Sequence, residues 1–155
     1  MNSKQTFLTE AGLAKLEEEL QHLRTTRRQE VAHRLHQALE EGDLLENAEL
    51  EDARNEQAFV EGRILTLESM LRSAVIIEED GPHETVGLGS YVTVSEDNGP
   101  AETYHIVGSA EADPAHGFIS NESPLGVALM GRKVGETAEV QAPDGALVFK
   151  IVAIK

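Results

Sequence analysis

The chain has no cysteine and no tryptophan, and aromatic residues make up only 4% of its 155 residues. Without cysteine, a disulfide framework, a thiolate metal site and a cysteine nucleophile are all excluded. The small number of aromatic rings argues against a large aromatic-lined ligand pocket. A reducing compartment is compatible with this composition.

Long apolar segments are missing as well. No run of about 18 apolar residues occurs, and the N-terminal sequence MNSKQTFLTEAG lacks the apolar core of a secretory signal. We therefore expect a soluble, cytoplasmic protein that makes no membrane contact.

Basic residues are scarce. The 28 acidic and 13 basic residues give a formal net charge of −15. Because an acidic surface repels phosphates, unaided binding to duplex nucleic acid is not expected. Any contact with nucleic acid should be local or arranged by a partner protein, so DNA binding would be indirect. The apolar share of 40% argues against intrinsic disorder.

The N-terminal half has helical periodicity. Thr9 suits the N-cap of a first helix, whose apolar stripe weakens at Arg27 and Arg28 and then resumes. A second segment keeps an uninterrupted heptad spacing with one polar member, Gln57. The apolar positions are Leu13, Leu16, Leu20, Leu23, Val31, Leu35 and Ala38 in the first segment, and Leu50, Ala53, Val60, Ile64, Leu67, Leu71 and Ala74 in the second.

Two such stripes joined by a short break bury each other by folding back antiparallel. Gly42 suits the end of the first helix. At 1.5 Å per residue, arms of about 30 residues would span roughly 45 Å. Since no third helical segment is present to cover the pair, we expect a projecting hairpin that satisfies its own seam, and hence a monomer.

After Ile77 the pattern changes to short β-branched or alternating runs separated by turn signals. Ser123 followed by Pro124 predicts the start of one short helix, which ends near Gly131. The four aromatic residues of these runs are expected to pack in a core. The predicted strands are 91–94, 103–107, 118–120, 137–140 and 147–154.

The sequence thus predicts an α+β protein with three parts. Residues 1–77 would form a long antiparallel coiled-coil hairpin with an acidic tip. Residues 78–88 would form a linker, and residues 89–155 a small antiparallel β domain with one short helix.

The break between the two helical segments is strongly acidic. From Glu40 to Glu56 there are eight acidic residues and one basic residue, Arg54. Asp43 and Glu46 have the spacing of a capping box, in which both side chains satisfy free backbone N–H groups. The same two carboxylates could instead hold a hard cation such as Mg²⁺, provided that a partner supplies further ligands. These residues alone leave both interpretations open.

The segment Gly42–Glu49, GDLLENAE, resembles the tip signature of the Gre transcript-cleavage factors. The family's other motifs follow in the same order over nearly the whole chain, and together they favour the metal-binding interpretation. They are Leu8-Thr9 with Gly12 and LEEEL at 16–20, EQAFVEGRI at 56–64, SPLG at 123–126, ALMGRKVGE at 128–136 and Pro143-Asp144-Gly145. The last three resemble the family's FKBP-like C-terminal domain.

The resemblance implies that the FKBP-like domain docks at the secondary channel of bacterial RNA polymerase through a loop containing Glu122, Ser123 and Pro124. The hairpin would pass down the channel, where Asp43 and Glu46 would share a Mg²⁺ ion with the polymerase and help to orient or activate water. The chain would not be an enzyme. It would stimulate the polymerase's own cleavage of backtracked nascent RNA and so rescue arrested complexes.

The resemblance also assigns roles around the acidic pair. Gly42, Asn47 and Glu49 would support the tip, and Arg54 would contact the RNA 3′ end. The chain departs from the family pattern at Leu39, Leu45 and Leu50. This departure motivates an alternative function, a Gre-like channel inhibitor or competitor without cleavage activity. A folding helper or isomerase based on the FKBP-like half is a third hypothesis.

Two further clusters have less specific interpretations. Arg24, Arg27 and Arg28 form the only basic cluster, which we expect to pair with nearby glutamates. His33 and His36 could face a metal together, but without a third ligand a solvated helix face is favoured.

Overall fold

The structure, a computed structural model, describes residues 4–41, 48–79, 83–97 and 99–155. It divides into two compact units. One comprises Leu13–Ser73, and the other combines Met1–Gly12 with Ala74–Lys155. We call them the hairpin unit and the sheet unit.

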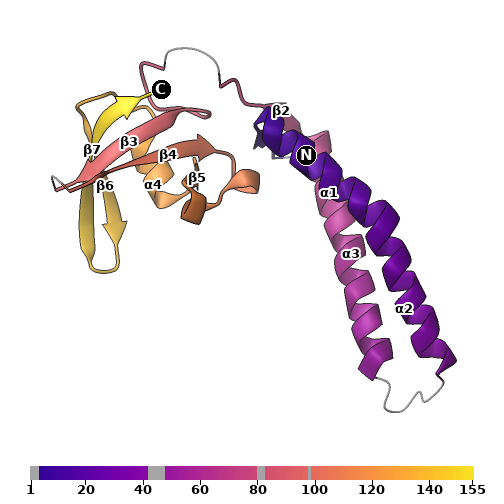
Figure 1. The fold of residues 1–155 in the computed structure, drawn as a ribbon. Coiled ribbons are helices and arrows are strands. Elements are labelled where there is room, and N and C mark those ends of the chain that lie inside the picture. The colour runs from indigo at the N-terminus through magenta and orange to yellow at the C-terminus, as the bar shows by residue number, and fades with distance from the viewer. Residues whose placement is uncertain (1–3, 42–47, 80–82, 98) are drawn as a thin grey trace. The chain divides into compact units, whose positions relative to one another are not determined.

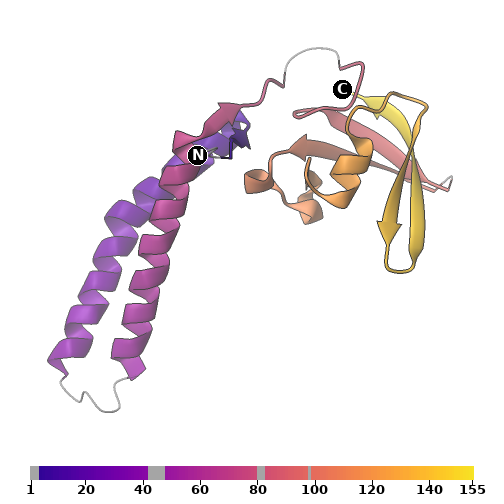
Figure 2. The same cartoon turned by 180° about the vertical axis from the view of Figure 1, so that it is seen from behind.

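The hairpin unit consists of two helical arms that lie side by side in both views (Figures 1 and 2). The first arm contains α1 (Glu10–His22), a π-helical segment η1 (Leu23–Arg27) and α2 (Arg28–Glu40). The second arm is α3 (Ala48–Arg72), which packs against η1 and α2. The predicted helical hairpin is confirmed.

A single row of apolar side chains closes the two arms against each other. Its buried members lie at the positions that the 3-4 spacing predicts, whereas Gln57 is exposed. The buried residues are Leu16, Leu20, Leu23, Val31, Ala38, Leu50, Ala53, Val60, Ile64 and Leu67.

The π-helical segment η1 coincides with the stretch where the first stripe weakens. Leu23 and Val31 are eight residues apart, one more than a heptad, and both are buried in the seam. A π turn holds an extra residue, so it returns Val31 to the face that meets α3. The sequence predicts a continuous helix here, and its apolar spacing does not reveal the change of helix type.

The sheet unit also contains two short parallel strands, one just before the helices in the chain and one just after them. Strand β1 (Thr6–Leu8) pairs with β2 (Ala74–Ile76), and the N–H of Ile77 donates to the carbonyl of Leu8 at 2.7 Å. Thr9 then caps α1 as predicted, because its Oγ1 accepts the N–H of Gly12 at 3.0 Å. These two strands were not predicted.

Glu111 ties this cap to the rest of the sheet unit. Its carboxylate accepts the N–H of Thr9 at 2.7 Å and the hydroxyl of Thr9 at 2.6 Å. A Cβ on Gly12 would lie 2.2 Å from the carboxylate carbon of Glu111, so a larger residue there would displace this carboxylate from Thr9.

The main sheet has five strands in the order β5-β4-β3-β7-β6. All pairings are antiparallel except that of β4 with β5, which is parallel. The prediction of an antiparallel sheet is therefore correct for every neighbouring pair but one. The strands are β3 (Tyr91–Glu96), β4 (Ala101–Val107), β5 (Phe118–Ser120), β6 (Thr137–Ala142) and β7 (Gly145–Ile154).

Helix α4 (Pro124–Leu129) contacts β5 and β6, and Leu129 enters a closed apolar core with the sheet. Ser123 caps this helix as predicted. Of the four aromatic residues predicted for the core, Tyr104 and Phe149 pack against it. The other two, Tyr91 and Phe118, are partly exposed instead. The buried core residues are Val86, Val92, Val94, Ile106, Ile119, Leu129, Ala138 and Ile151.

Tyr91 and Phe118 were misplaced by the prediction because strand alternation places them on the opposite face. Both flank His105 in register across β3, β4 and β5. The rings of Tyr91 and His105 stack with their centroids 4.1 Å apart.

Candidate functional site

The acidic end of the hairpin is only partly described. Helix α2 ends at Glu40 and α3 begins at Ala48. The predicted site residues Gly42, Asp43, Glu46 and Asn47, and also Leu45, lie outside the described residues, so their assignments stay predictions.

The described residues on either side of this gap bear on the departures from the family pattern. Leu50 is buried in the seam, with only 7% of its surface exposed, so it serves packing between the arms and not contact with a partner. Leu39 lies on α2 with 47% of its surface exposed. Glu49 is exposed in the first turn of α3, where a negative charge is favourable beside the helix N-terminus.

Most basic side chains of the hairpin are neutralised by glutamates. Glu56 bridges Arg27 and Arg34, which both come from the other arm. The prediction that Arg24, Arg27 and Arg28 form ion pairs is confirmed. Further pairs join Arg24 to Glu68 at 2.8 Å, Arg28 to Glu61 at 2.8 Å and Arg63 to Glu19 at 2.8 Å.

Two of these ion pairs lower the pKa of the glutamate and raise the pKa of its arginine partner. Hydrogen bonding to Arg63 lowers the pKa of Glu19, and hydrogen bonding to Arg28 lowers the pKa of Glu61. Both carboxyls therefore remain ionised at neutral pH, and their arginine partners are occupied within the hairpin.

Arg54 differs from Arg63, the paired arginine on the same helix. It is exposed, and among the described parts of the chain it forms no ion pair. His36 pairs with Glu40 at 3.1 Å, and His33 is exposed, in line with a solvated helix face.

Within the described ranges, no three acidic or histidine side chains come together in a way that could hold a metal ion. Asp43 and Glu46 are outside those ranges. Their carboxylate oxygens are the donors that Mg²⁺ prefers, so the chemistry of the pair fits this ion. Two carboxylates leave the remaining coordination positions to water or to a partner.

The second predicted site is the loop before α4. Ser123 Oγ accepts the N–H of Gly126 at 3.0 Å and donates to the carbonyl of Ser120 at 2.7 Å. The N–H of Glu122 donates to Ser120 Oγ at 3.0 Å. These bonds fix the loop backbone, with Pro124 at the first position of the helix.

The carboxylate of Glu122 is held from two sides. It accepts the hydroxyl of Ser109 at 2.6 Å and forms an ion pair with Lys4 at 3.0 Å. The hydrogen bond from Ser109 and then the pairing with Lys4 lower the pKa of Glu122. The loop therefore presents an ionised carboxylate in a defined position.

Close packing beneath the loop adds to this rigidity. A Cβ on Gly126 would lie 1.9 Å from the carbonyl oxygen of Ser120, so only glycine fits there. The supporting residues Ser109, Lys4 and Glu111 were not predicted from the sequence. No local signal could reveal them, since Thr9 and Glu111, for example, are 102 positions apart.

Two family profiles account for nearly the whole chain. The profile described as "Transcription elongation factor, N-terminal" matches residues 6–76, and that described as "Transcription elongation factor, GreA/GreB, C-term" matches residues 81–155. The chain belongs to the GreA/GreB family of transcription elongation factors.

Relatives within this family are similar over almost their full length. The transcription elongation factor GreA of Acetivibrio thermocellus is 51% identical over 155 residues, covering 99% of this chain and 98% of that protein. GreA of Bacillus subtilis is 53% identical over 148 residues, covering 95% and 94%. The crystal structure of GreA factor homolog 1 (Gfh1) of Thermus thermophilus is 36% identical, covers 98% of this chain and 99% of that one, and gives a TM-score of 0.46.

Membership in the family confirms the resemblance found in the sequence motifs. None of the helices that the structure describes is long and apolar enough to cross a membrane.

Proposed function

We propose that this chain is a transcript-cleavage factor that acts on bacterial RNA polymerase. It would insert the hairpin into the secondary channel and stimulate the polymerase's own hydrolysis of backtracked RNA. One observation carries the proposal: in a chain of the GreA/GreB family, the arms close their seam against each other and end in an acidic stretch.

Asp43 and Glu46 are the residues to which we assign the chemical role. Their carboxylates would complete a metal site with ligands of the polymerase and orient the attacking water by accepting its hydrogen bonds. Mg²⁺ bound there would stabilise negative charge developing on the phosphate. The chain would supply no complete active site of its own.

The described residues near the tip have supporting roles in this proposal. Arg54, exposed and without an ion-pair partner in the described parts of the chain, would contact the RNA 3′ end. Glu49 would support the tip together with Gly42 and Asn47. The nearby arginines are paired with glutamates, so they would not bind the RNA phosphates in place of Arg54.

The loop of Glu122, Ser123 and Pro124 would dock the sheet unit on the polymerase. Its backbone is fixed by hydrogen bonds to Ser120, so little conformational entropy would be lost on docking. Because the hairpin uses its seam internally, the factor would act as a monomer, in the cytoplasm, with the polymerase and the RNA 3′ end as its partners.

A second candidate function is occupancy of the channel without cleavage. The exposed Leu39 favours it, because the family often has a basic residue at this position and the basic surface is correspondingly thin. This function would show as slower nucleotide addition with no gain in cleavage.

The test is transcript cleavage by a purified, backtracked bacterial polymerase complex in Mg²⁺. We expect the chain to stimulate cleavage, and Asp43→Ala and Glu46→Ala to abolish the stimulation while still binding polymerase. Glu18→Ala removes an exposed acidic residue of α1, serves as the charge-matched control and should remain active. Binding without stimulation by the intact chain would refute the cleavage function and favour channel occupancy.

A further inference from the structure

One face of α3 is exposed and uncharged in an otherwise strongly charged helix. At 3.6 residues per turn its members lie within about 120° of arc, well away from the seam. All of them are exposed. They are Asn55, Ala58, Phe59, Gly62, Leu65, Thr66 and Ser69, and we call them the outer face of α3.

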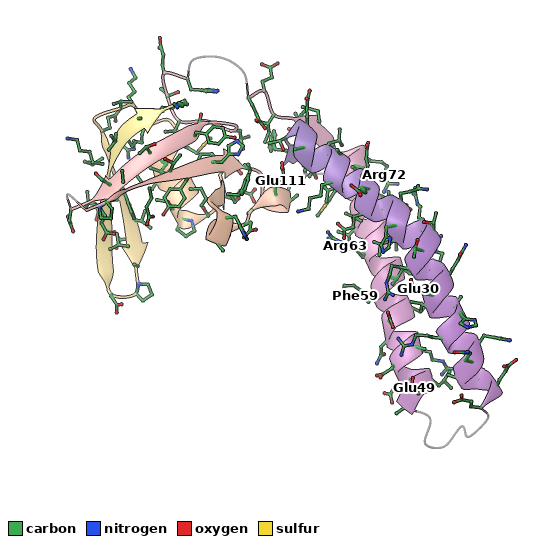
Figure 3. All side chains as sticks on the ribbon, in the orientation of Figure 1. Glu30, Glu49, Phe59, Arg63, Arg72 and Glu111 are labelled. Carbon is green, nitrogen blue, oxygen red and sulfur yellow. The ribbon has the colours of Figure 1, made fainter. Side chains whose placement is uncertain are left out.

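Two large apolar side chains dominate the outer face. Phe59 is 70% exposed and Leu65 is 66% exposed, more than any other large apolar residue that the structure describes. Figure 3 shows Phe59 pointing away from the other arm. Single exposed apolar residues are common, but here two occupy the same uncharged face, at opposite edges of its arc and about 9 Å apart along the helix axis.

Gly62 lies between Phe59 and Leu65, and nothing inside the chain explains it. A Cβ at Gly62 would meet no atom within 4 Å. Its φ is not positive, so the backbone does not need glycine either. Glycine inside a helix is less favourable than alanine. An external partner that approaches the helix backbone closely would account for it.

The charges around the outer face restrict the surface chemistry that a partner can have. On its two sides Glu61 and Arg63 are already neutralised by Arg28 and Glu19 of the other arm. Towards the acidic end of the hairpin, Glu51 and Asp52 are exposed without ion pairs in the described residues. A partner with an apolar surface and a basic group at that edge would be complementary.

A second copy of this chain does not fit that description, because each copy has a net charge of −15. Two acidic edges brought together would repel each other. The channel wall of the polymerase is the surface that a hairpin inserted from solution would contact along its length.

We propose that the outer face of α3 is a docking surface for an apolar segment of RNA polymerase, with Phe59 and Leu65 as anchors and Gly62 as the point of closest approach. This inference rests on the proposed function but is separate from the chemistry at Asp43 and Glu46. It assigns the hairpin a second contact, distinct from its tip.

The test measures binding of the full chain to bacterial RNA polymerase and, in parallel, melting of the helices by circular dichroism. Gly62→Ala should raise the helix melting temperature by about 2–6 °C and yet weaken binding about tenfold. Gly87→Ala is the matched control, since Gly87 also has open space around its Cβ position and no positive φ. It should leave binding unchanged.

Substitutions at the anchors complete the experiment. Phe59→Glu and Leu65→Glu should each weaken binding about tenfold or more with little change in melting, whereas Phe59→Leu should retain most of the affinity. If the wild type binds polymerase and the Gly62, Phe59 and Leu65 variants bind equally well, the inference is wrong and the proposed function stands. If the wild type does not bind polymerase, both fail.

An outcome by analytical ultracentrifugation would also overturn the inference. A dimer of the wild-type chain that Phe59→Glu converts to a monomer would assign the outer face to a second copy.

Discussion

The hairpin unit and the sheet unit are stabilised in different ways. In the sheet unit, side chains such as Leu129 and Ile151 are enclosed between α4 and five strands. In the hairpin unit, one row of apolar residues lies between two helices, and glutamate–arginine pairs join the arms on either side of it. A two-helix unit has no second layer with which to enclose a core.

This difference in stabilisation is consistent with the separate roles that the two units would have in the proposed function. A unit that is one seam thick can enter a narrow channel, and its stability depends on many small contacts spread along its length. A unit with a closed core can hold a rigid loop, such as Glu122–Pro124, in a fixed position. In the proposed function, the hairpin would therefore provide the reach and the sheet unit the docking surface.

The largest effect that would test this contrast is expected from removing one enclosed leucine in each unit. Leu129→Ala should lower the free energy of unfolding of the sheet unit by about 3–5 kcal/mol, because the surrounding core cannot collapse into the cavity. Leu67→Ala should cost the hairpin unit only about 2–3 kcal/mol, since two helices can move closer together.

Native-state hydrogen exchange of amides in each unit would measure both values. The exposed Leu147→Ala serves as a control and should change neither unit appreciably. An equal or greater loss in the hairpin unit would contradict the comparison.

A smaller effect is expected from the ion pairs between the arms. Glu56→Gln removes the carboxylate shared by Arg27 and Arg34, and should lower the stability of the hairpin by about 0.5–1 kcal/mol. Arg27 keeps Glu30 and Arg34 keeps Glu49 as partners, which limits the loss. Chemical denaturation followed by helical circular dichroism would measure it.

Glu18→Gln removes the same charge from an exposed position of α1 and is the appropriate control. If the two variants lose the same stability, the loss is caused by the change in net charge and not by the ion pairs of Glu56 with Arg27 and Arg34.

The smallest effect concerns the docking loop of the sheet unit. The pKa of Glu122 lies below its ordinary value of 4.5, so its contribution to stability is complete above that pH and is lost as the pH falls through the lowered value. Ser109→Ala and Lys4→Ala should each raise this pKa, because each removes a hydrogen bond to the ionised carboxylate. Carboxyl titration by NMR would measure both shifts, and an unchanged pKa in either variant would mean that its side chain does not hold the loop.

The sequence was sufficient to predict the α+β fold and the position of most elements. Heptad spacing located the seam, and alternation located the five main strands. The sequence was not sufficient where the fold depends on pairing between distant segments, as for β1 with β2 and β4 with β5. Alternation also cannot tell which face of a sheet a helix covers, and this is why Tyr91 and Phe118 were assigned to the core.

The same distinction between local motifs and contacts of distant segments applies to the candidate sites. Asp43, Glu46 and the loop at Glu122 were recognisable because their motifs are contiguous. The support that Ser109 gives to Glu122 was not, because it arises only when η2 (Ser109–Glu111) packs beside β5. Leu50 was predicted from the heptad spacing to lie in the seam, and it is buried there.

The π-helical segment at Leu23–Arg27 has a consequence for how the arm could change in evolution. A π turn is an α-helix with one inserted residue, so losing a single residue such as Thr25 would restore a regular helix without rotating the part beyond it. Val31 and Ala38 would still meet α3. The segment is therefore where the first arm can lose one residue of length while the part beyond it keeps its orientation.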